Sequence, residues 1–395
     1  MPGRPEGDPS VILGAGYAGL ATWHAAHQRS RGRWPILLVD RHPVHVLRTE
    51  LYRVGRIAAA EGALSRWAIP LRQALRGDSG AIRTGTVEAI DLADRTVTLD
   101  GTPLRFRELV ICLGSVPAYY GVAGAAENTL DVYRLSDAQK LAQAIRSALG
   151  GRGREGAPVR VAVIGGGSTG TEVAAEIATV RWEKVVGRPC PPVRVLLVAG
   201  KLPLLAGLPE PLVHHARALL GRAGVVLDEG RNVTEVHRES PTLEDGTVLP
   251  FDVAVWAAGI HPPPVVEAME AAHGRGHRLI VDEHLELPDH PGVFALGDVA
   301  EFIDPRTHLA VPATAQAALA EAPIAGANLV ARRRGRPLAP FQYREKGVIV
   351  ALGIGHGSGM VGHLSVWGRP AALLQRAVQV GHRYAAERGG TPPGL

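Results

Sequence analysis

The stretch Ser10-Val-Ile-Leu-Gly14-Ala-Gly16-Tyr-Ala-Gly19 decides the fold that the sequence predicts. A short apolar run leads into a glycine-rich turn, and an alanine-rich helical pattern follows. This order of strand, tight turn and helix is typical of a dinucleotide-binding unit. Gly14 permits the turn, Gly16 lets the backbone approach a pyrophosphate, and Gly19 lets helix and strand pack closely. The free N–H groups that begin the helix then bind the anion.

A second copy of this pattern begins at Val161 and runs to Glu176. Gly165, Gly167 and Gly170 repeat the spacing of the first three glycines. One such motif is a weak signal, because glycine-rich turns between strands and helices are common. Two copies, both in strand–turn–helix context, favour two dinucleotide sites over two ordinary turns.

The end of each following strand bears on which nucleotide is bound. Asp40 ends the run Ile36–Val39, where a carboxylate accepts hydrogen bonds from a ribose diol; the alternative is a solvated aspartate. The matching position after Val193–Val198 is Ala199, so no acidic side chain is available there to bind a ribose. Lys201 either favours a 2′-phosphate or simply faces solvent, and the choice between NADH and NADPH stays open.

The remaining segments predict an α/β fold with two Rossmann-like dinucleotide-binding domains and a small C-terminal α+β region. We expect a hairpin at 86–101, buried strands at 108–114, 253–259 and 293–298, and a helix at 312–328. Pro262-Pro-Pro264 is not expected to continue a strand or helix. The expected domains are an FAD-type domain in two parts, 9–118 and 284–338, a nicotinamide domain at 119–283, and a C-terminal region at 339–395.

Composition excludes several classes of protein. The chain has 395 residues, 46% of them hydrophobic, and only two cysteines, Cys112 and Cys190. A disulfide scaffold, a zinc cluster and a CxxC redox pair are therefore not expected. The net charge of +5 comes almost entirely from arginine, and no aromatic–basic platform indicates nucleic-acid binding. Residues 1–9 lack the apolar core of a signal peptide, and no window predicts a membrane-spanning helix.

The segment Ala371–Ala385 predicts an amphipathic helix near the C-terminus. Its apolar face would carry Leu373, Leu374, Ala377, Val378, Gly381 and Tyr384, and its polar face Gln375, Arg376, Gln379, His382 and Arg383. Such a helix either docks its apolar face on the body of the protein or lies in a lipid interface, and both alternatives stay open.

Several further segments resemble one family. They are His45–Gly55, Leu113–Gly124 with its hinge glycine Gly114, Phe294–Ala300, Pro312–Ala318 and Tyr343–Gly347, together with the second glycine motif. The combined pattern resembles the two-dinucleotide-binding-domain flavoproteins of the pyridine nucleotide-disulfide oxidoreductase superfamily. Within them it is most similar to type II NADH dehydrogenase, the single-chain NADH:quinone oxidoreductase.

The resemblance implies FAD in the first site and NADH or NADPH in the second. By position, the FAD residues would be Gly14, Gly16, Gly19, Asp40, Thr49, Gly114, Asp298 and Ala315. The nicotinamide nucleotide would be held by Gly165, Gly167, Gly170 and Gly259. The catalytic candidates would be Glu172 near nicotinamide and flavin, Gln316 beside the flavin where quinone arrives, and Lys346, a surface lysine or a charge on the quinone path.

The implied reaction passes a hydride from nicotinamide to flavin N5 and then two electrons to menaquinone or ubiquinone, without proton pumping. The absence of paired thiols argues against the disulfide reductase and sulfide:quinone branches. The implied location is the cytoplasm, peripheral on the inner face of the cell membrane, with a homodimer possible. A soluble NAD(P)H:acceptor reductase remains as an alternative, favoured if the helix Ala371–Ala385 docks its apolar face on the protein. A flavin- or nucleotide-binding sensor also remains, because Ala320 replaces a glutamine usual in the family and no ribose acid stands at Ala199.

Overall fold

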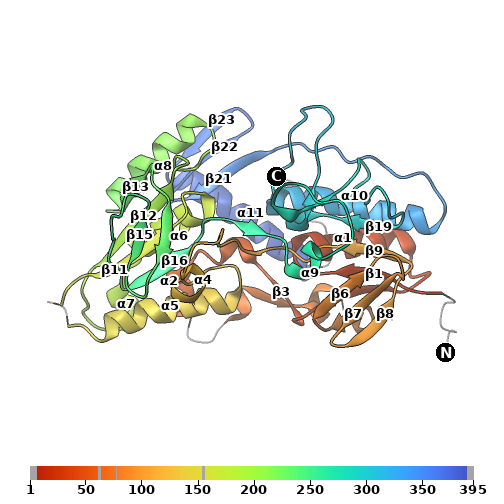
Figure 1. Cartoon of the computed structure of the whole chain (residues 1–395), viewed down its shortest axis with the longest axis horizontal. Coiled ribbons are helices and arrows are strands. Elements are labelled where there is room, and N and C mark those ends of the chain that lie inside the picture. Colours follow the sequence, from red (N-terminus) through yellow and green to blue (C-terminus); the bar gives the residue numbers. More distant parts are fainter. Residues whose placement is uncertain (1–6, 61–63, 77, 154–155, 389–395) are drawn as a thin grey trace.

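The computed structural model describes residues 7–60, 64–76, 78–153 and 156–388. Residues 1–6, part of the segment 1–9 for which no signal peptide is predicted, lie outside the described residues. Two parallel sheets form the cores of two halves that lie side by side, and helix α11 (Arg369–Arg388) runs between the halves (Figure 1). In the part of the chain that the structure describes, no helix is long and apolar enough to cross a bilayer.

The first half is built on a parallel sheet in the strand order β19-β9-β1-β2-β5. These strands are β1 (Ser10–Leu13), β2 (Ile36–Asp40), β5 (Ile82–Thr84), β9 (Glu108–Ile111) and β19 (Val293–Ala295). Its central strands β1 and β9 are buried throughout, as expected for a parallel sheet covered on both faces. Helices α1 (Tyr17–Ser30) and α10 (Ala315–Arg333) pack against each other and against this core. The predicted hairpin is confirmed as part of a small antiparallel sheet of β6 (Val87–Asp91), β7 (Thr96–Leu99) and β8 (Thr102–Arg105).

The second half repeats the plan with the strand order β13-β12-β11-β16. These strands are β11 (Val159–Ile164), β12 (Val193–Gly200), β13 (Val226–Glu229) and β16 (Val253–Trp256). Their core is shared with helices α5 (Leu135–Gly150), α6 (Ser168–Thr179) and α8 (Glu210–Arg222). Two short antiparallel strands, β10 (Val116–Pro117) and β17 (Ile260–His261), pair where the chain passes between the halves.

Smaller elements complete the two halves. The short strand pairs are β3 (Val44–Val46) with β4 (Ala68–Pro70), β14 (Val233–Val236) with β15 (Pro241–Leu243), and β18 (Leu279–Ile280) with β20 (Ala300–Glu301). The short helices are α2 (Val54–Ala59), α3 (Leu71–Ala74), α4 (Ala125–Asn128), α7 (Trp182–Val186) and α9 (Pro264–Glu267).

Two predicted boundaries are corrected. Helix α10 begins at Ala315 rather than 312, because the Thr314 hydroxyl caps it by accepting the Ala317 N–H at 3.2 Å. The three prolines continue neither strand β17 nor a helix, as expected, and helix α9 begins at Pro264, where proline fits because the first turn needs no N–H donor. Strand β12 continues to Gly200 instead of ending at Val198.

The C-terminal region contains an antiparallel sheet that the sequence only partly indicated. Its strands are β21 (Gly347–Ala351), β22 (Gly357–Val361) and β23 (Leu364–Trp367). The glycine-rich stretch 353–362, for which no strand was predicted, includes strand β22. A Cβ on Gly359 would lie 2.6 Å from the Val348 carbonyl oxygen, so glycine is needed for these strands to approach.

Helix α11 packs on the body of the protein through a face on which Ala371, Gln379, Ala385 and Ala386 are buried. No residue of the predicted apolar face is buried, so the alternative in which that face docks is wrong. Gln379 is only 7% exposed, whereas Leu373, Val380 and Tyr384 are 67%, 58% and 54% exposed. The exposed side chains recur at helical spacing and form one stripe, with the exposed Ala377 between them. We call Leu373, Ala377, Val380 and Tyr384 the outer stripe.

Candidate functional site

The first glycine turn has the shape of a dinucleotide cradle. Gly14 has φ +97°, and a Cβ there would lie 2.2 Å from the Cys112 carbonyl oxygen. A Cβ on Gly19 would lie 1.8 Å from the Gly14 carbonyl oxygen. A Cβ on Gly16 would meet no atom within 4 Å, so this glycine faces open space at the start of α1. The turn is therefore closed on its protein side and open where a pyrophosphate would lie.

The second glycine turn repeats this geometry at the start of α6. A Cβ on Gly165 would lie 2.2 Å from the Ala257 carbonyl oxygen, and one on Gly170 would lie 1.9 Å from the Gly165 carbonyl oxygen. Gly167 again faces open space. The residues of both turns thus fit dinucleotide pyrophosphates, one on each parallel sheet.

The two strand ends next to these turns differ in charge. Asp40 ends β2, where its Oδ2 accepts the Ala15 N–H at 2.7 Å and its Oδ1 accepts the His42 N–H at 2.8 Å. A carboxylate oxygen has more than one lone pair, so both oxygens keep acceptor capacity for a ribose diol. At the second turn, Lys201 Nζ lies 2.8 Å from Glu244 Oε2, so its charge is already paired within the chain.

Asp298 is linked to the region of Gly114 and Thr49 by residues that sequence reasoning missed. The Ser115 hydroxyl donates to Asp298 Oδ2 at 2.7 Å. The Arg48 guanidinium donates to the Ser115 carbonyl at 3.2 Å, and it would lie 2.8 Å from a Cβ on Gly114. Thr49 is exposed, and its Oγ1 lies 2.9 Å from Tyr17 Oη. Ser115 and Arg48 each adjoin a predicted residue in sequence, and that adjacency is the only signal that could have found them.

A cavity of about 330 Å³ opens beside Asp298. Its lining includes Val311, Pro312 and Ala313, which lead into helix α10, and Ile260 and Arg278 from the opposite side. The cavity brings the segment before Ala315 and Gln316 to the same place as Asp298, two parts of the predicted site that are separate in sequence.

The side chain of Gln316 joins α10 to the C-terminal region. Its Nε2 donates to the Gly347 carbonyl at 2.9 Å, and its Oε1 accepts the Lys346 N–H at 2.9 Å. The Lys346 side chain itself is exposed, so the structure brings its backbone, rather than its charge, to Gln316. Gln316 therefore fixes where the strand β21 begins relative to α10.

Glu172 lies in the first turns of α6, as predicted, and faces the C-terminal region. Its Oε1 accepts the Ala351 N–H at 3.0 Å and the Gln375 side-chain N–H at 3.1 Å. Burial raises the pKa of Glu172 to about 7, against the opposing effects of these two hydrogen bonds and of Arg53. This carboxyl group can therefore both hold and release a proton near neutral pH.

Gly259 contacts protein rather than open space. A Cβ there would lie 2.0 Å from Tyr120 Oη, and the Gly259 carbonyl accepts the Ala118 N–H at 3.0 Å. A close approach of nicotinamide at this residue stays a prediction.

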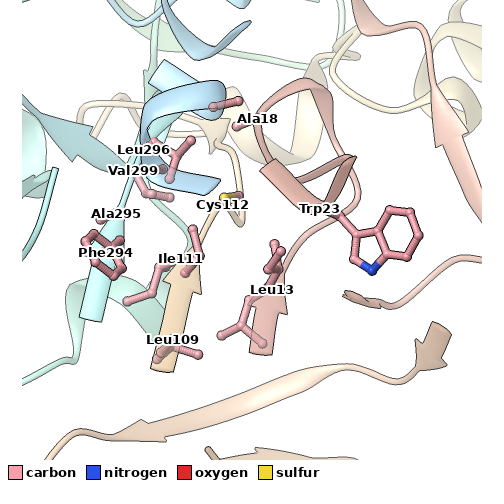
Figure 2. Close-up of a cluster of buried hydrophobic side chains, with 14 of the residues drawn as sticks. Leu13, Ala18, Trp23, Leu109, Ile111, Cys112, Phe294, Ala295, Leu296 and Val299 are labelled. Carbon is pink, nitrogen blue, oxygen red and sulfur yellow. The ribbon is translucent and has the colours of Figure 1, made fainter. Parts of the chain in front are cut away.

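The cysteines form no redox pair. Cys112 and Cys190 are both free, and Cys112 is buried among the apolar side chains that Figure 2 shows around β9 and β19. Burial raises the pKa of the Cys112 thiol, which disfavours the reactive thiolate. The predicted inertness of this residue agrees with its surroundings.

Comparison with known proteins decides the family. The sequence profile described as pyridine nucleotide-disulphide oxidoreductase matches residues 9–322. The chain belongs to this family. A demethylphylloquinone reductase, NdbB, from Synechocystis is 31% identical over 94% of this chain and 91% of its own length. A type II NADH:quinone oxidoreductase from Mycobacterium tuberculosis is 30% identical over 87% of this chain and 77% of its own length.

Solved structures share the fold. NDH2 from Plasmodium falciparum superposes with a TM-score of 0.79, covering 98% of this chain and 99% of its own, at 14% identity. A sulfide:quinone oxidoreductase from Aquifex aeolicus gives the same TM-score at 17% identity, covering 98% and 93%. These likenesses confirm the predicted α/β architecture with Rossmann-like halves.

Proposed function

We propose that this protein is a FAD-dependent NAD(P)H:quinone oxidoreductase of the type II NADH dehydrogenase kind. The proposal rests mainly on the pair of glycine turns. In each turn the first and last glycines pack against protein backbone, and the central glycine faces open space. Two such turns in one chain serve two dinucleotides, one resident and one exchanging. Relatives similar over most of their length are named as quinone reductases, which supports quinone as the acceptor.

The first turn would hold FAD, and the second would hold the nicotinamide nucleotide. When bound, FAD would accept a hydride from the nicotinamide and pass an electron pair to the quinone. Gly14, Gly16, Gly19 and Asp40 would bind the adenosine and pyrophosphate, and Asp298, Thr49, Gly114 and Ala315 would bind the remainder. Gly165, Gly167 and Gly170 would bind the nicotinamide pyrophosphate, with Gly259 beside the nicotinamide.

The chain itself supplies orientation and proton binding. Glu172, whose pKa burial raises to about 7, would hold a proton beside the flavin. Gln316 would shape the quinone side of the site through its bonds to Lys346 and Gly347. With Cys112 buried and Cys190 distant in sequence, the chain's own thiols take no part in the reaction.

We further propose that the protein binds the inner face of the cell membrane through α11. The outer stripe gives the helix an apolar surface that faces away from the protein. The exposed Arg369, Arg376 and Arg388 lie on the same helix, where they would meet anionic headgroups. Leu364 and Trp367 of strand β23, which contacts α11, are also exposed, at 73% and 53%.

Steady-state turnover tests the proposed reaction. FAD-loaded protein should oxidise NADH or NADPH only when a quinone is present, and one quinol should form for each nicotinamide oxidised. A soluble reductase for another acceptor would leave quinone unreduced and would respond instead to a small redox protein or another small oxidant. That result would replace the proposal with the acceptor-reductase alternative.

A further inference from the structure

Beneath α11 lies a cluster of polar side chains. The proposed reaction assigns a role to only one of them, Glu172. Glu172 and Glu176 are one turn apart on α6, and Gln375 and Gln379 are one turn apart on α11. Residues Tyr52 and Arg53, just before α2, lie between the two helices. We call these six residues the junction cluster.

The junction cluster has two layers. In the first layer Gln375 connects Glu172 with Tyr52, because its Nε2 donates to Glu172 Oε1 at 3.1 Å and its Oε1 accepts the Tyr52 hydroxyl at 3.4 Å. In the second layer the Arg53 guanidinium donates to Gln379 Oε1. Gln379 thus holds Arg53 from α11, as Gln375 holds Glu172.

The second layer also contains the buried carboxyl group of Glu176, one turn beyond Glu172 on α6. Glu176 is 4% exposed and Arg53 is 8% exposed. Among the described residues, neither Glu176 Oε1 nor Arg53 Nε has a hydrogen-bond partner, although Arg53 Nε lies 3.8 Å from Glu50 Oε2 in an ion pair. Of the charged groups that lower the pKa of Glu176, Arg53 is the strongest, whereas burial raises it. A buried carboxylate needs such a cation, since desolvation strongly penalises an isolated charge.

Both carboxyl groups of α6 respond to Arg53. Burial is the largest effect on Glu172 and raises its pKa, Arg53 lowers it, and the neighbouring Glu176 raises it. Other groups face the cluster from the packed elements. They are the Ala351 N–H from β21, Glu50 and the exposed Arg56 from the segment around α2, and Arg376 and Arg383 from α11, which act on Glu50.

The chemistry of quinone reduction requires a proton at this place. A hydride carries two electrons and one proton, whereas a quinone takes up two electrons and two protons to become a quinol. Each turnover therefore draws one proton from solvent. Two carboxyl groups one turn apart with a single buried cation favour a state in which the pair holds one proton.

We propose that Arg53, held by Gln379, is a positioning residue that makes Glu172 and Glu176 a coupled pair sharing one proton for quinone reduction. The inference rests on the proposed function for its purpose, but the coupling itself is a property of the folded chain. The sequence motifs assigned no role to Arg53, Gln379 or Glu176.

Two substitutions should move the titration of the pair in opposite directions. Arg53→Gln removes the cation, so the pH midpoint of quinone-dependent turnover should rise by about 1 pH unit. Glu176→Gln removes the like charge, so the midpoint should fall. Arg53→Lys keeps the charge and should restore most of the original midpoint. Arg56→Gln is the comparison variant. Arg56 also lowers the pKa of Glu176, but its exposed guanidinium is screened by water, so this substitution should raise the midpoint by less than Arg53→Gln does.

A second readout needs no turnover. The infrared carboxyl band of each protein, followed against pH without nicotinamide or quinone, should show the same two opposite shifts. If Arg53 only anchored α11, both variants would lose FAD content or thermal stability while the midpoints stayed in place, and the proposal would be overturned. Shifts in the same direction would also overturn it. If wild-type protein reduced no quinone, the proposed function would fail, yet the infrared titration would still decide the coupling.

Discussion

Gln316 and Gly347 are joined by a hydrogen bond of 2.9 Å from the side-chain Nε2 to the backbone carbonyl. The bond connects the start of α10, which adjoins the proposed flavin site, to the first strand of the C-terminal sheet. The same side chain accepts the Lys346 N–H, so one amide fixes two consecutive backbone groups. The quinone side of the proposed site therefore depends on a side chain that is already committed to the protein's own backbone.

Gln316→Ala should impair the quinone half of the reaction more than the nicotinamide half. Loss of both hydrogen bonds frees the segment at Lys346–Gly347, at a cost of about 1–3 kcal/mol in local stability. Stopped-flow absorbance can follow flavin reduction and reoxidation separately. Equal slowing of both half-reactions would contradict the assigned place of Gln316. Gln316→Glu, which keeps the acceptor oxygen but loses the donor, should fall between wild type and Gln316→Ala.

The central glycines of the two turns should separate the two nucleotides. Gly16→Ala and Gly167→Ala place a methyl group in open space at φ −71° and −73°, so folding should be unaffected. Gly16→Ala should abolish bound FAD, whereas Gly167→Ala should retain FAD and lose affinity for NAD(P)H. Flavin absorbance and nicotinamide titration measure the two effects.

Gly19→Ala is the contrasting variant for this experiment. Its Cβ would lie 1.8 Å from the Gly14 carbonyl oxygen, so it should lower the thermal midpoint as well as FAD content. A Gly16→Ala protein that keeps all of its flavin would remove the first turn from the FAD site.

Much of this site was predictable because the glycine motifs are imposed by local backbone geometry. The clashes at Gly14, Gly19, Gly165 and Gly170 are with backbone close in space, and they leave glycine as the only fitting residue. Such constraints are visible in a sequence as fixed spacing. The α/β fold followed from the same motifs.

The orientation of α11 was not predictable, because periodicity shows that a helix has two faces but not which face is covered. Gln375 and Gln379 turn inward only because Tyr52, Arg53 and Glu172 offer them partners from distant parts of the chain. Strand β22 was missed for a related reason. Its glycines resemble a loop until the neighbouring strand β21 is known to pack against them.

The outer stripe should determine membrane binding. Replacing Leu373, Val380 and Tyr384 with serine should release the protein from vesicles that contain anionic lipid, since it removes the apolar surface without touching Gln375 or Gln379. Vesicle flotation measures the bound fraction. Leu202→Ser is the matched control, because Leu202 is 70% exposed but lies in the nicotinamide half. Undiminished flotation of the triple variant would place the attachment elsewhere.

Glu321 should make stability depend on pH. It is buried on α10 and accepts the Gly297 N–H at 2.7 Å, and burial raises its pKa to about 7 from an ordinary 4.5. A raised carboxyl pKa contributes stability below about pH 4.5, and that contribution is lost as the pH rises through 7. The side chain in Glu321→Gln does not titrate. The free energy of unfolding of this variant minus that of wild type should therefore increase by on the order of 3 kcal/mol from pH 5 to pH 8. Urea unfolding of the FAD-free proteins across this range measures the difference. A constant difference would show that Glu321 is ionised without penalty.

Anaerobic mixing of the FAD-loaded protein with a nicotinamide nucleotide and then a quinone shows whether this protein passes electrons from nicotinamide through flavin to quinone. NADH or NADPH should bleach the flavin absorbance, and a quinone added next should restore it in full. A flavin that neither nucleotide bleaches would contradict the proposed function. So would a bleached flavin that no quinone restores but that a small redox protein does.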